Sequence, residues 1–306
     1  MDRFSTEKTY TLEDLERWNR EEPSLAVLGF PVKHSVSPAM HNAAIAQLNA
    51  GSNRFEGWRY FRFETRPEDL IAALPRFHEK GFFGLNLTVP HKELVLPTLE
   101  KVDPAAREIG AVNTLKRCGN GYEGFNTDGY GLEQGIRIEL HLEFANREVY
   151  ILGAGGAGRA AAVQALRSSC RSLTLVNRNQ ERLAKLIETL RPIASDRSIP
   201  LRGFSPVDDS LSFPSGALVV NATSLGLKDD DPLPVKESLL SGEIALYDMI
   251  YNPTETPLMR SVSRLGGSVA NGLSMLVYQG VRALEIWTET SVDARAMDNA
   301  ARAALA

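Results

Sequence analysis

A lysine that follows a strand-like run is the first candidate for chemistry in this sequence. The run FGLNLTV alternates apolar and polar residues, with Asn86 and Thr88 on the polar face, as a half-buried strand requires. Pro90 has no backbone donor and disfavours helix in the residue before it, so we expect the strand to end at Val89 and to leave Lys92 beside its end. A lone lysine usually lies in solvent, so a catalytic role for Lys92 needs support from other residues.

A glycine-rich loop is the second candidate. GAGGAG follows the apolar strand VYIL and precedes the helical run RAAAVQAL, which gives the G-x-G-x-x-G spacing at Gly153, Gly155 and Gly158. Glycines allow a tight turn and a close backbone approach, and a helix N-terminus offers free N–H groups to a pyrophosphate. The alternative is a turn that only lets the helix pack on the strand. We predict a dinucleotide site whose loop contacts are Gly153, Ala154, Gly155, Gly156, Ala157 and Gly158.

The end of the next strand indicates which dinucleotide binds. LTLV is followed by Asn177 and Arg178, at the place where an NAD site usually has Asp or Glu on the ribose hydroxyls. An amide beside a guanidinium accepts a 2′-phosphate that a carboxylate would repel, and Arg182 lies one helical turn further on. The pattern favours NADP, although solvated arginines at a helix start would read the same way.

These residues must be positioned by an α/β chain of two domains, because 306 residues exceed the usual length of one domain. Strand-like and helix-like segments alternate from Ser24 to about Leu115, which predicts parallel strands covered by helices. A more regular alternation from near Arg147 indicates a doubly wound Rossmann domain. From Gly272 the chain reads as amphipathic helix that returns to the first domain. We predict a cleft between two domains, with these bounds: an N-terminal extension (1–24), an α/β substrate-binding catalytic domain (25–128, completed by 272–306) and a Rossmann NADP-binding domain (129–271).

Composition argues against several other classes. The net charge of −4, with 24% charged and 43% hydrophobic residues, offers no overall attraction to nucleic acid. Cys118 and Cys170 show no CxxC spacing and the histidines no metal-ligand spacing, so we expect no disulfide and no metal, and a cytoplasmic location. No signal peptide or membrane span is evident. TLEDLERWNR reads as a short helix with Thr11 as N-cap and Asp14 completing a capping box.

Five stretches together resemble the shikimate dehydrogenase family: GFPVKHSVSPAMHN, NLTVPHKE, GAVNTL, FNTDGYG and NGLSMLVYQG. They occur in the family's order on both sides of the glycine loop, and the resemblance runs from about Leu25 to the end of the chain. It implies that the first domain and the C-terminal helices hold the substrate and that the middle domain holds the cofactor. Spacing alone supports only an NADP-dependent oxidoreductase.

The resemblance implies roles for individual residues. Ser35 and Ser37 match a serine pair that binds the substrate carboxylate, and we expect Ser37, before Pro38, to cap a helix N-terminus that attracts an anion. Lys92 matches the catalytic lysine, and Asp128 matches its carboxylate partner. The other implied substrate contacts are Asn86, Thr88, Asn113, Tyr251 and Gln279, and the other implied cofactor contacts are Thr223, Met249, Gly272 and Met275.

Those roles fit the reduction of a ketone. Negative charge develops on the ketone oxygen as hydride arrives, so a rigid ammonium oriented by a carboxylate can supply both charge stabilisation and a proton. The implied reaction is the reversible reduction of 3-dehydroshikimate to shikimate with NADPH, in the pathway to chorismate and the aromatic amino acids. We expect a monomer or a homodimer with a small-molecule substrate.

Two alternatives share this fold: a relative that acts on quinate or an amino analogue, with NAD, and a non-catalytic ligand-binding regulator. Intact Lys92 and Asp128 argue against the regulator. His34, His41 and His91 are rival acid–base residues, because histidine titrates near neutral pH. His91 replaces an aromatic residue that we expect in many members, and it could alter the pKa of the adjacent Lys92 or the substrate preference.

Overall fold

The computed structural model describes residues 4–88 and 90–305, so Val89, the predicted end of the strand before Lys92, lies outside the described residues. The chain divides into two compact units, residues 1–127 with 279–306 and residues 128–278. Both units are α/β, as predicted. The segment 1–24 belongs to the first unit, and one boundary falls inside α9 (Leu273–Thr288), between Tyr278 and Gln279.

Among the described residues, the first unit contains a mixed seven-stranded sheet in the order β1-β3-β2-β4-β6-β7-β5. Strands β1, β3, β2 and β4 run parallel, whereas β6 is antiparallel to both β4 and β7. The bounds are β1 (Thr9–Tyr10), β2 (Ser24–Gly29), β3 (Arg59–Glu64), β4 (Phe82–Leu87), β5 (Lys101–Val102), β6 (Thr114–Cys118) and β7 (Gly121–Phe125).

The β6–β7 hairpin makes this sheet mixed, whereas the alternation in the sequence predicted parallel strands. Gly119 and Asn120 connect the two strands, and Gly119 has a φ of +48°. A two-residue turn of this type between alternating segments is a hairpin signal, so the sequence did contain the information. The hairpin pairs β6 with β4 and places Thr114 opposite Asn86.

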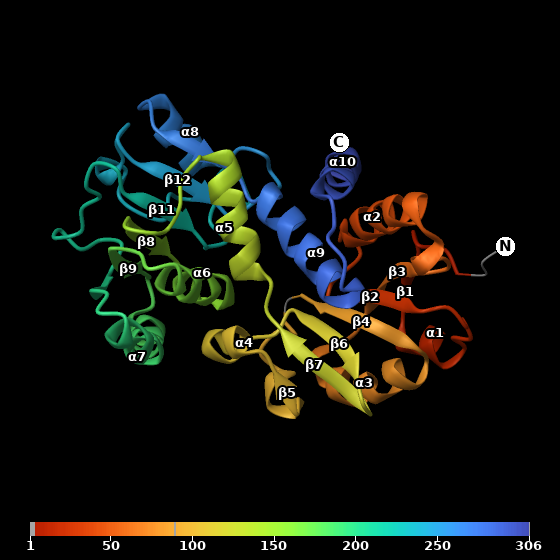
Figure 1. The fold of residues 1–306 in the computed structure, drawn as a ribbon. Coiled ribbons are helices and arrows are strands. Elements are labelled where there is room, and N and C mark those ends of the chain that lie inside the picture. Colours follow the sequence, from red (N-terminus) through yellow and green to blue (C-terminus); the bar gives the residue numbers. More distant parts are fainter. Residues whose placement is uncertain (1–3, 89, 306) are drawn as a thin grey trace. The chain divides into compact units, whose positions relative to one another are not determined.

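Helices cover both faces of the first sheet. α2 (Ser37–Gly51) joins β2 to β3, and α3 (Leu70–Glu79) joins β3 to β4 in the opposite direction across the sheet. Because such crossovers are right-handed, the two helices lie on opposite faces, as Figure 1 shows. α10 (Ala294–Leu305) packs against α2. The shorter helices of this unit are α1 (Leu12–Glu16) and α4 (Pro104–Ile109).

The N-terminal segment forms part of the core of the first unit. α1 begins with the predicted capping box, in which Thr11 Oγ1 accepts from Asp14 N and the Asp14 carboxylate accepts from Thr11 N. Tyr10 and Trp18 are only 3% and 2% exposed and pack against aromatic side chains of β3. The segment therefore stabilises β3, which also contains Tyr60.

The second unit contains, within the described part of the chain, a six-stranded parallel sheet in the order β10-β9-β8-β11-β12-β13. Counted from β8, this is the 3-2-1-4-5-6 order of a doubly wound dinucleotide-binding sheet, so the predicted Rossmann fold is confirmed. The bounds are β8 (Glu148–Leu152), β9 (Ser172–Val176), β10 (Leu201–Phe204), β11 (Leu218–Asn221), β12 (Ala245–Asp248) and β13 (Ser268–Ala270).

The order in which the chain adds strands to this sheet reverses at its middle, between β8 and β11. α6 (Gly156–Arg167) and α7 (Gln180–Asp196) lead from β8 through β9 to β10, whereas α8 (Pro257–Arg264) leads from β12 to β13 the other way. Right-handed crossovers therefore put α6 and α7 on one side of the sheet and α8 on the other (Figure 1). Ligands of such sheets bind at the carboxyl ends of the two strands where the order reverses, here β8 and β11. α5 (Asp128–Glu139) packs against α6.

In the described part of the chain, none of the helices is long and apolar enough to cross a membrane. The His, Cys, Asp and Glu side chains of those residues form no group of three or more that could hold a metal ion.

Candidate cofactor and substrate sites

Glycine occupies each position of the G-x-G-x-x-G loop for a different physical reason. Gly153 has a φ of +109°, and a Cβ there would meet the carbonyl oxygen of Ala222 at 2.9 Å. A Cβ on Gly158 would meet the Gly153 carbonyl oxygen at 2.1 Å, so only glycine lets α6 approach the loop this closely. A Cβ on Gly155 would face open space, and no side chain caps α6 at this N-cap residue. The backbone N–H groups of the first turn are therefore suited to a pyrophosphate.

A cavity of about 670 Å³ lies beside this loop, at the carboxyl ends of β8, β9 and β11. This is the point where the strand order reverses, the expected location of a dinucleotide. The predicted cofactor contacts that line the cavity are Gly153, Ala154, Gly155, Asn177, Arg178, Arg182 and Thr223. The structure thus brings together residues that three separate parts of the sequence had supplied.

Asn177 connects the glycine loop to the start of α7. Its Oδ1 accepts from Ala154 N at 3.1 Å, and its Nδ2 donates to the Asn179 carbonyl oxygen at 2.8 Å. Asn179 in turn caps α7, because its Oδ1 accepts from Arg182 N at 2.8 Å. Arg178 and Arg182 are exposed, and among the described residues neither guanidinium forms an ion pair. Two positive charges are therefore available at the cavity, and the residue before them is an amide that cannot repel a phosphate.

Other predicted cofactor contacts lie outside the lining of this cavity. Gly156, Ala157 and Gly158 belong to the first turn of α6. Met249, Gly272 and Met275 form a second group after β12: Gly272 N donates to the Ile250 carbonyl oxygen at 3.0 Å, and Met275 N donates to the Tyr247 hydroxyl at 3.1 Å. A Cβ on Gly272 would meet the Met249 carbonyl oxygen at 2.1 Å, so this contact also requires glycine.

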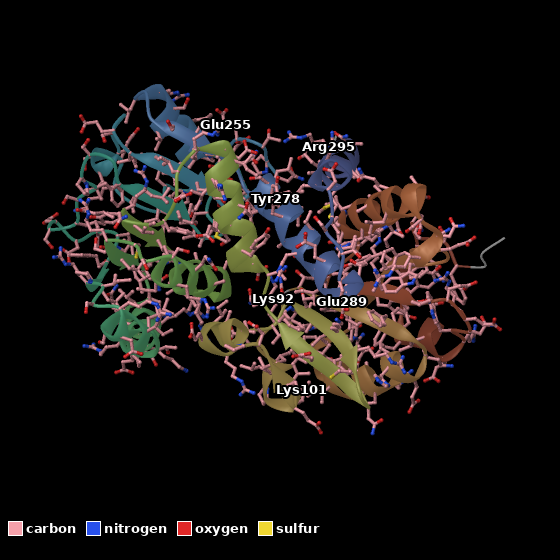
Figure 2. The ribbon with its side chains drawn as sticks, viewed as in Figure 1. Lys92, Lys101, Glu255, Tyr278, Glu289 and Arg295 are labelled. Atoms are coloured by element: carbon pink, nitrogen blue, oxygen red, sulfur yellow. The ribbon has the colours of Figure 1, made fainter. Side chains whose placement is uncertain are left out.

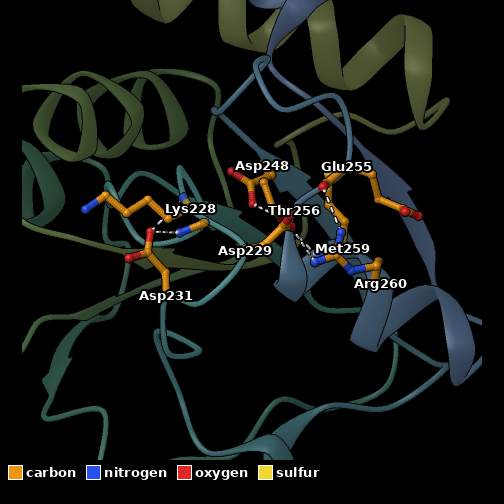
Figure 3. A network of polar contacts seen from close by, with 9 residues as sticks. Lys228, Asp229, Asp231, Asp248, Glu255, Thr256, Met259 and Arg260 are labelled. Atoms are coloured by element: carbon orange, nitrogen blue, oxygen red, sulfur yellow. Dashed lines mark hydrogen bonds and ion pairs between the residues drawn. The ribbon is translucent and has the colours of Figure 1, made fainter.

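A buried polar network at the ends of β11 and β12, which the sequence motifs do not reveal, supports the cavity-lining contacts and the group after β12. Asp248 is fully buried, and its carboxylate accepts from Asn221 Nδ2 (3.0 Å), Thr256 Oγ1 (2.7 Å) and Ile250 N (3.1 Å). Asn221 Oδ1 accepts from the backbone N–H and the hydroxyl of Thr223, a cavity-lining residue. Figure 3 shows Asp248 joined to Thr256, which caps α8 through Met259 N. Polar residues that end the apolar runs LVVN and ALYD were the available signal.

Burial also alters the protonation equilibria of this region. Burial raises the pKa of Asp248 above its usual range, and the hydrogen bonds from Asn221, Thr256 and Ile250 N oppose that shift. Burial raises the pKa of the Tyr251 phenol as well, so this predicted substrate contact remains a hydrogen-bond donor at neutral pH.

In the first unit, the predicted N-cap at Ser37 is wrong. α2 begins at Ser37, Val36 occupies the N-cap with helical φ and ψ of −86° and −2°, and no side chain caps the helix there. The turn starts one residue early because Ser35 Oγ accepts from Ser37 N at 3.3 Å. The Ser37 side chain is buried instead.

Two of the predicted substrate contacts, Asn86 and Asn113, belong to one buried hydrogen-bond chain. Tyr60 hydroxyl donates to Asn86 Oδ1 at 2.7 Å, and Asn86 Nδ2 donates to the Asn113 carbonyl oxygen (3.1 Å) and Thr114 Oγ1 (3.0 Å). Thr114 Oγ1 donates to Asn113 Oδ1 at 3.0 Å. The chain therefore joins β3, β4 and the start of β6 through Tyr60, Asn86 and Thr114.

The turn after β4 positions Lys92. Thr88 N donates to the Leu28 carbonyl oxygen at 3.0 Å, and the Lys92 carbonyl oxygen accepts from Val112 N at 2.8 Å. Lys92, labelled in Figure 2, is half-buried in the first unit, whereas the buried Asp128 opens α5 in the second. Among the other predicted substrate contacts, Tyr251 lies in the second unit and Gln279 in the first.

Two of the three rival histidines, His41 and His91, are buried in the first unit, whereas His34 is exposed. His91 is buried, and its Nε2 lies 2.9 Å from the Thr65 carbonyl oxygen, which can only accept, so Nε2 carries the hydrogen. Burial lowers the pKa of His91, although the Thr65 hydrogen bond opposes this shift. His41 is also fully buried, and burial lowers its pKa to about 3. Lowered pKa values favour the neutral form of both rings near pH 7, so neither ring holds the second proton that an imidazolium acid would donate.

The doubly wound sheet, with a glycine loop at its reversal point, defines a dinucleotide-binding α/β protein. The family model for the shikimate dehydrogenase substrate binding domain matches residues 27–115, and the shikimate 5′-dehydrogenase C-terminal domain matches residues 272–302. The NADP⁺-dependent shikimate dehydrogenase of Geobacter metallireducens is 38% identical over 267 residues, which cover 86% of this chain and 90% of the relative. The chain belongs to the shikimate dehydrogenase family.

Solved structures agree with this membership. A Thermus thermophilus shikimate 5-dehydrogenase, solved with NADP(H) and shikimate, has a TM-score of 0.79 and 34% identity, over 92% of this chain and 99% of that one. A 5-ketofructose reductase from a Gluconobacter species has a TM-score of 0.81 and 28% identity, over 93% of this chain and 99% of that one. Since the same fold serves a different substrate, the substrate must be argued from the site.

Proposed function

We propose that this protein reversibly reduces 3-dehydroshikimate to shikimate with NADPH, a step in the pathway to chorismate and the aromatic amino acids. The observation that carries the proposal is the buried hydrogen-bond chain that joins Asn86 and Asn113, because the family resemblance assigns both residues to the substrate. A chain of fixed amides and hydroxyls suits a small ring with several hydroxyl groups. Thr88, Ser35, Ser37, Tyr251 and Gln279 complete the proposed substrate contacts.

The proposed chemistry is carried by Lys92 and Asp128. NADPH, when bound, supplies the hydride. The Lys92 ammonium stabilises the negative charge that develops on the ketone oxygen and donates the proton, and Asp128 orients the ammonium. The anchored turn after β4 fixes the backbone of Lys92, which favours a rigid general acid.

The proposed cofactor site is the cavity beside the glycine loop. The first turn of α6 binds the pyrophosphate, and Arg178 and Arg182 bind the 2′-phosphate, since no carboxylate follows β9 to repel it. The group formed by Met249, Gly272 and Met275 contacts the nicotinamide end. The second unit would then be the NADP-binding domain, and the first unit, with its C-terminal helices, the substrate-binding domain.

The proposed location is the cytoplasm. Cys118 and Cys170 are both free, as cysteines are in a reducing compartment. The proposed mechanism needs no metal ion, because Lys92 supplies the positive charge at the ketone oxygen.

A steady-state panel tests the proposed function. Shikimate and quinate are oxidised with NADP⁺ or NAD⁺, and 5-ketofructose is reduced with NADPH or NADH. We expect the highest kcat/KM for shikimate with NADP. A preference for quinate with NAD would favour the quinate relative, and turnover of 5-ketofructose alone would favour a reductase of that type. Specific binding of shikimate without turnover of any pair would favour the non-catalytic regulator.

A further inference from the structure

Tyr60 is a fully buried residue of β3 that neither the sequence motifs nor the family resemblance selected. Its hydroxyl donates to Asn86 Oδ1 at 2.7 Å. Tyr60 therefore contacts one of the proposed substrate-binding residues without itself being one of them.

One helix holds Tyr60 in place. Asn42 binds its backbone on both sides, because Asn42 Oδ1 accepts from Tyr60 N at 2.9 Å and Asn42 Nδ2 donates to the Tyr60 carbonyl oxygen at 2.8 Å. His41 stacks on the Tyr60 ring, with centroids 4.1 Å apart and planes 1° apart. His41 and Asn42 are adjacent in α2, so this helix fixes both the backbone and the ring of a single residue.

This arrangement is costly for the protein, which argues that it has a use. Among the described residues, neither His41 Nδ1 nor His41 Nε2 has a hydrogen-bond partner, although both atoms are buried. A buried polar group without a partner destabilises the folded state, and an apolar ring of similar size would avoid that penalty. The neutral imidazole does, however, provide a flat face against which the Tyr60 ring packs.

The hydrogen bonds around Asn86 determine what its amide can still do. A side-chain amide has two hydrogens and two acceptor lone pairs. Both hydrogens are directed to acceptors, the Asn113 carbonyl oxygen and Thr114 Oγ1, whose own hydrogen goes to Asn113 Oδ1. Oδ1 takes the Tyr60 hydrogen with one lone pair. The remaining capacity of Asn86 is one acceptor lone pair, so a ligand group at this position has to be a donor.

We infer that Tyr60 is a positioning residue that orients the Asn86 amide, so that Asn86 presents an acceptor to a hydroxyl group of the substrate. The inference rests on the proposed function, because it assigns a hydroxyl-bearing substrate to this site. It adds a chemical selection rule: a hydroxyl is accepted at Asn86, whereas a keto oxygen or a carboxylate there would meet an oxygen lone pair.

The test is Tyr60→Phe, which removes only the hydroxyl and keeps the ring against His41. We expect the KM for shikimate to rise roughly three- to tenfold, the factor that one ordinary hydrogen bond is worth. The KM for NADP should stay unchanged, because the cavity-lining residues belong to the second unit. An analogue that lacks the hydroxyl recognised by Asn86 should bind the variant and the parent protein nearly equally.

Tyr122→Phe is the matched control. Tyr122 is 5% exposed, lies in the same unit, and donates its hydroxyl hydrogen to the Phe82 carbonyl oxygen at 2.9 Å. It should lower the melting temperature to a similar extent without altering the KM for shikimate. An equal change of KM in both variants would mean that loss of a buried hydroxyl acts only through general stability, and the positioning role would be rejected.

Asn86→Ala separates this inference from the proposed function. If Asn86→Ala raises the KM for shikimate and Tyr60→Phe does not, the Tyr60 role is wrong and the proposed site stands. If neither variant changes it, both assignments fail. Should Tyr60→Phe not fold, Thr114→Val disturbs the same amide from its donor side, and an unchanged KM in that variant would equally overturn the inference.

Discussion

Arg178 follows β9, and its exposed side chain lines the cavity that is proposed to bind the cofactor. We expect Arg178→Ala to weaken the binding of NADP by roughly 1.5 to 3 kcal/mol, the contribution of a hydrogen bond to a charged group. The binding of NAD should be nearly unaffected, because NAD lacks the 2′-phosphate. The measurement is the KM of each cofactor at fixed shikimate. Arg191→Ala removes the same charge from an exposed position of α7 outside the cavity lining and should change neither value. An equal loss for both cofactors in Arg178→Ala would contradict the assignment.

Lys92 and Asp128 form the proposed catalytic unit. Removal of a positioned general acid costs about 10²- to 10⁴-fold in rate, so Lys92→Ala should lose kcat on that scale while the KM for shikimate changes much less. The kcat of Asp128→Asn should also fall steeply. The kcat of the double variant should be little lower than that of the slower single variant, because the effects of residues that act as a unit are non-additive.

Lys101→Ala is the matched control for the lysine, since Lys101 is an exposed residue of the same unit and should retain parent kcat. Near-parent kcat in folded Lys92→Ala, or strictly additive losses in the double variant, would assign the acid–base role to another residue. His91 would be the first to examine, although burial lowers its pKa.

Residues with a role in a local motif were readable from the sequence, whereas residues that act through others were not. The glycine loop and the Asn177, Arg178 pair could be predicted because strand, turn and helix follow one another along the chain. Tyr60 and Asn86 lie in different strands, and only the pairing of these strands with β2 brings their side chains together.

Strand ends, rather than whole strands, carry the cofactor-site contacts that were missed. Asn221 ends β11 and Asp248 ends β12, and their mutual hydrogen bond becomes visible only when the two strands are known to be neighbours. The shifted start of α2 had a similar cause. Val36 adopts helical φ and ψ, which could not be predicted for a valine before a Ser-Pro pair.

The strand-end network gives a prediction of its own. We expect Asp248→Asn to destabilise the protein by about 1 to 3 kcal/mol, because the amide would place N–H groups against the donors Asn221 Nδ2 or Thr256 Oγ1 and leave buried groups unsatisfied. The KM for NADP should rise as well, since Asn221 also holds Thr223. Urea unfolding and cofactor titration measure the two effects.

Asp229→Asn is the control within the same region. Asp229 forms an exposed ion pair with Arg260 at 3.0 Å, and such pairs contribute at most about 1 kcal/mol (Figure 3). If Asp248→Asn were no more harmful than Asp229→Asn, the network would not support the cofactor site.

For the whole molecule, the sequence predicted two α/β units, because strand-like and helix-like segments alternate in two runs, and the glycine loop follows the first strand of the second run. The role of the first 24 residues was not readable. Tyr10 and Trp18 lie there among acidic and basic side chains, and their burial depends on aromatic residues of β3 that are far away in the sequence. The segment therefore belongs to the first unit for reasons of packing and not of local pattern.

The stability of the first unit should fall in acid because of His41. Burial is the cause that lowers the pKa of His41 to about 3 in the folded protein, from an ordinary value of 6.5. The unfolded chain therefore binds a proton that the folded chain excludes as the pH falls below 6.5, and stability is lost progressively from 6.5 toward 3. The loss approaches about 1.4 kcal/mol per pH unit for one such group. Burial lowers the pKa of His91 in the same direction.

Tryptophan fluorescence isolates this effect, because the protein's three tryptophans, Trp18, Trp58 and Trp287, all lie in the first unit. We expect the urea midpoint reported by fluorescence to fall between pH 6.5 and 4.5, and His41→Gln to reduce the slope against pH even if it is less stable at pH 7. His141→Asn, at an exposed position with a φ of +55° that asparagine tolerates, should keep the parent slope. An unchanged slope in His41→Gln would show that the buried imidazole is not the group that makes the first unit sensitive to acid.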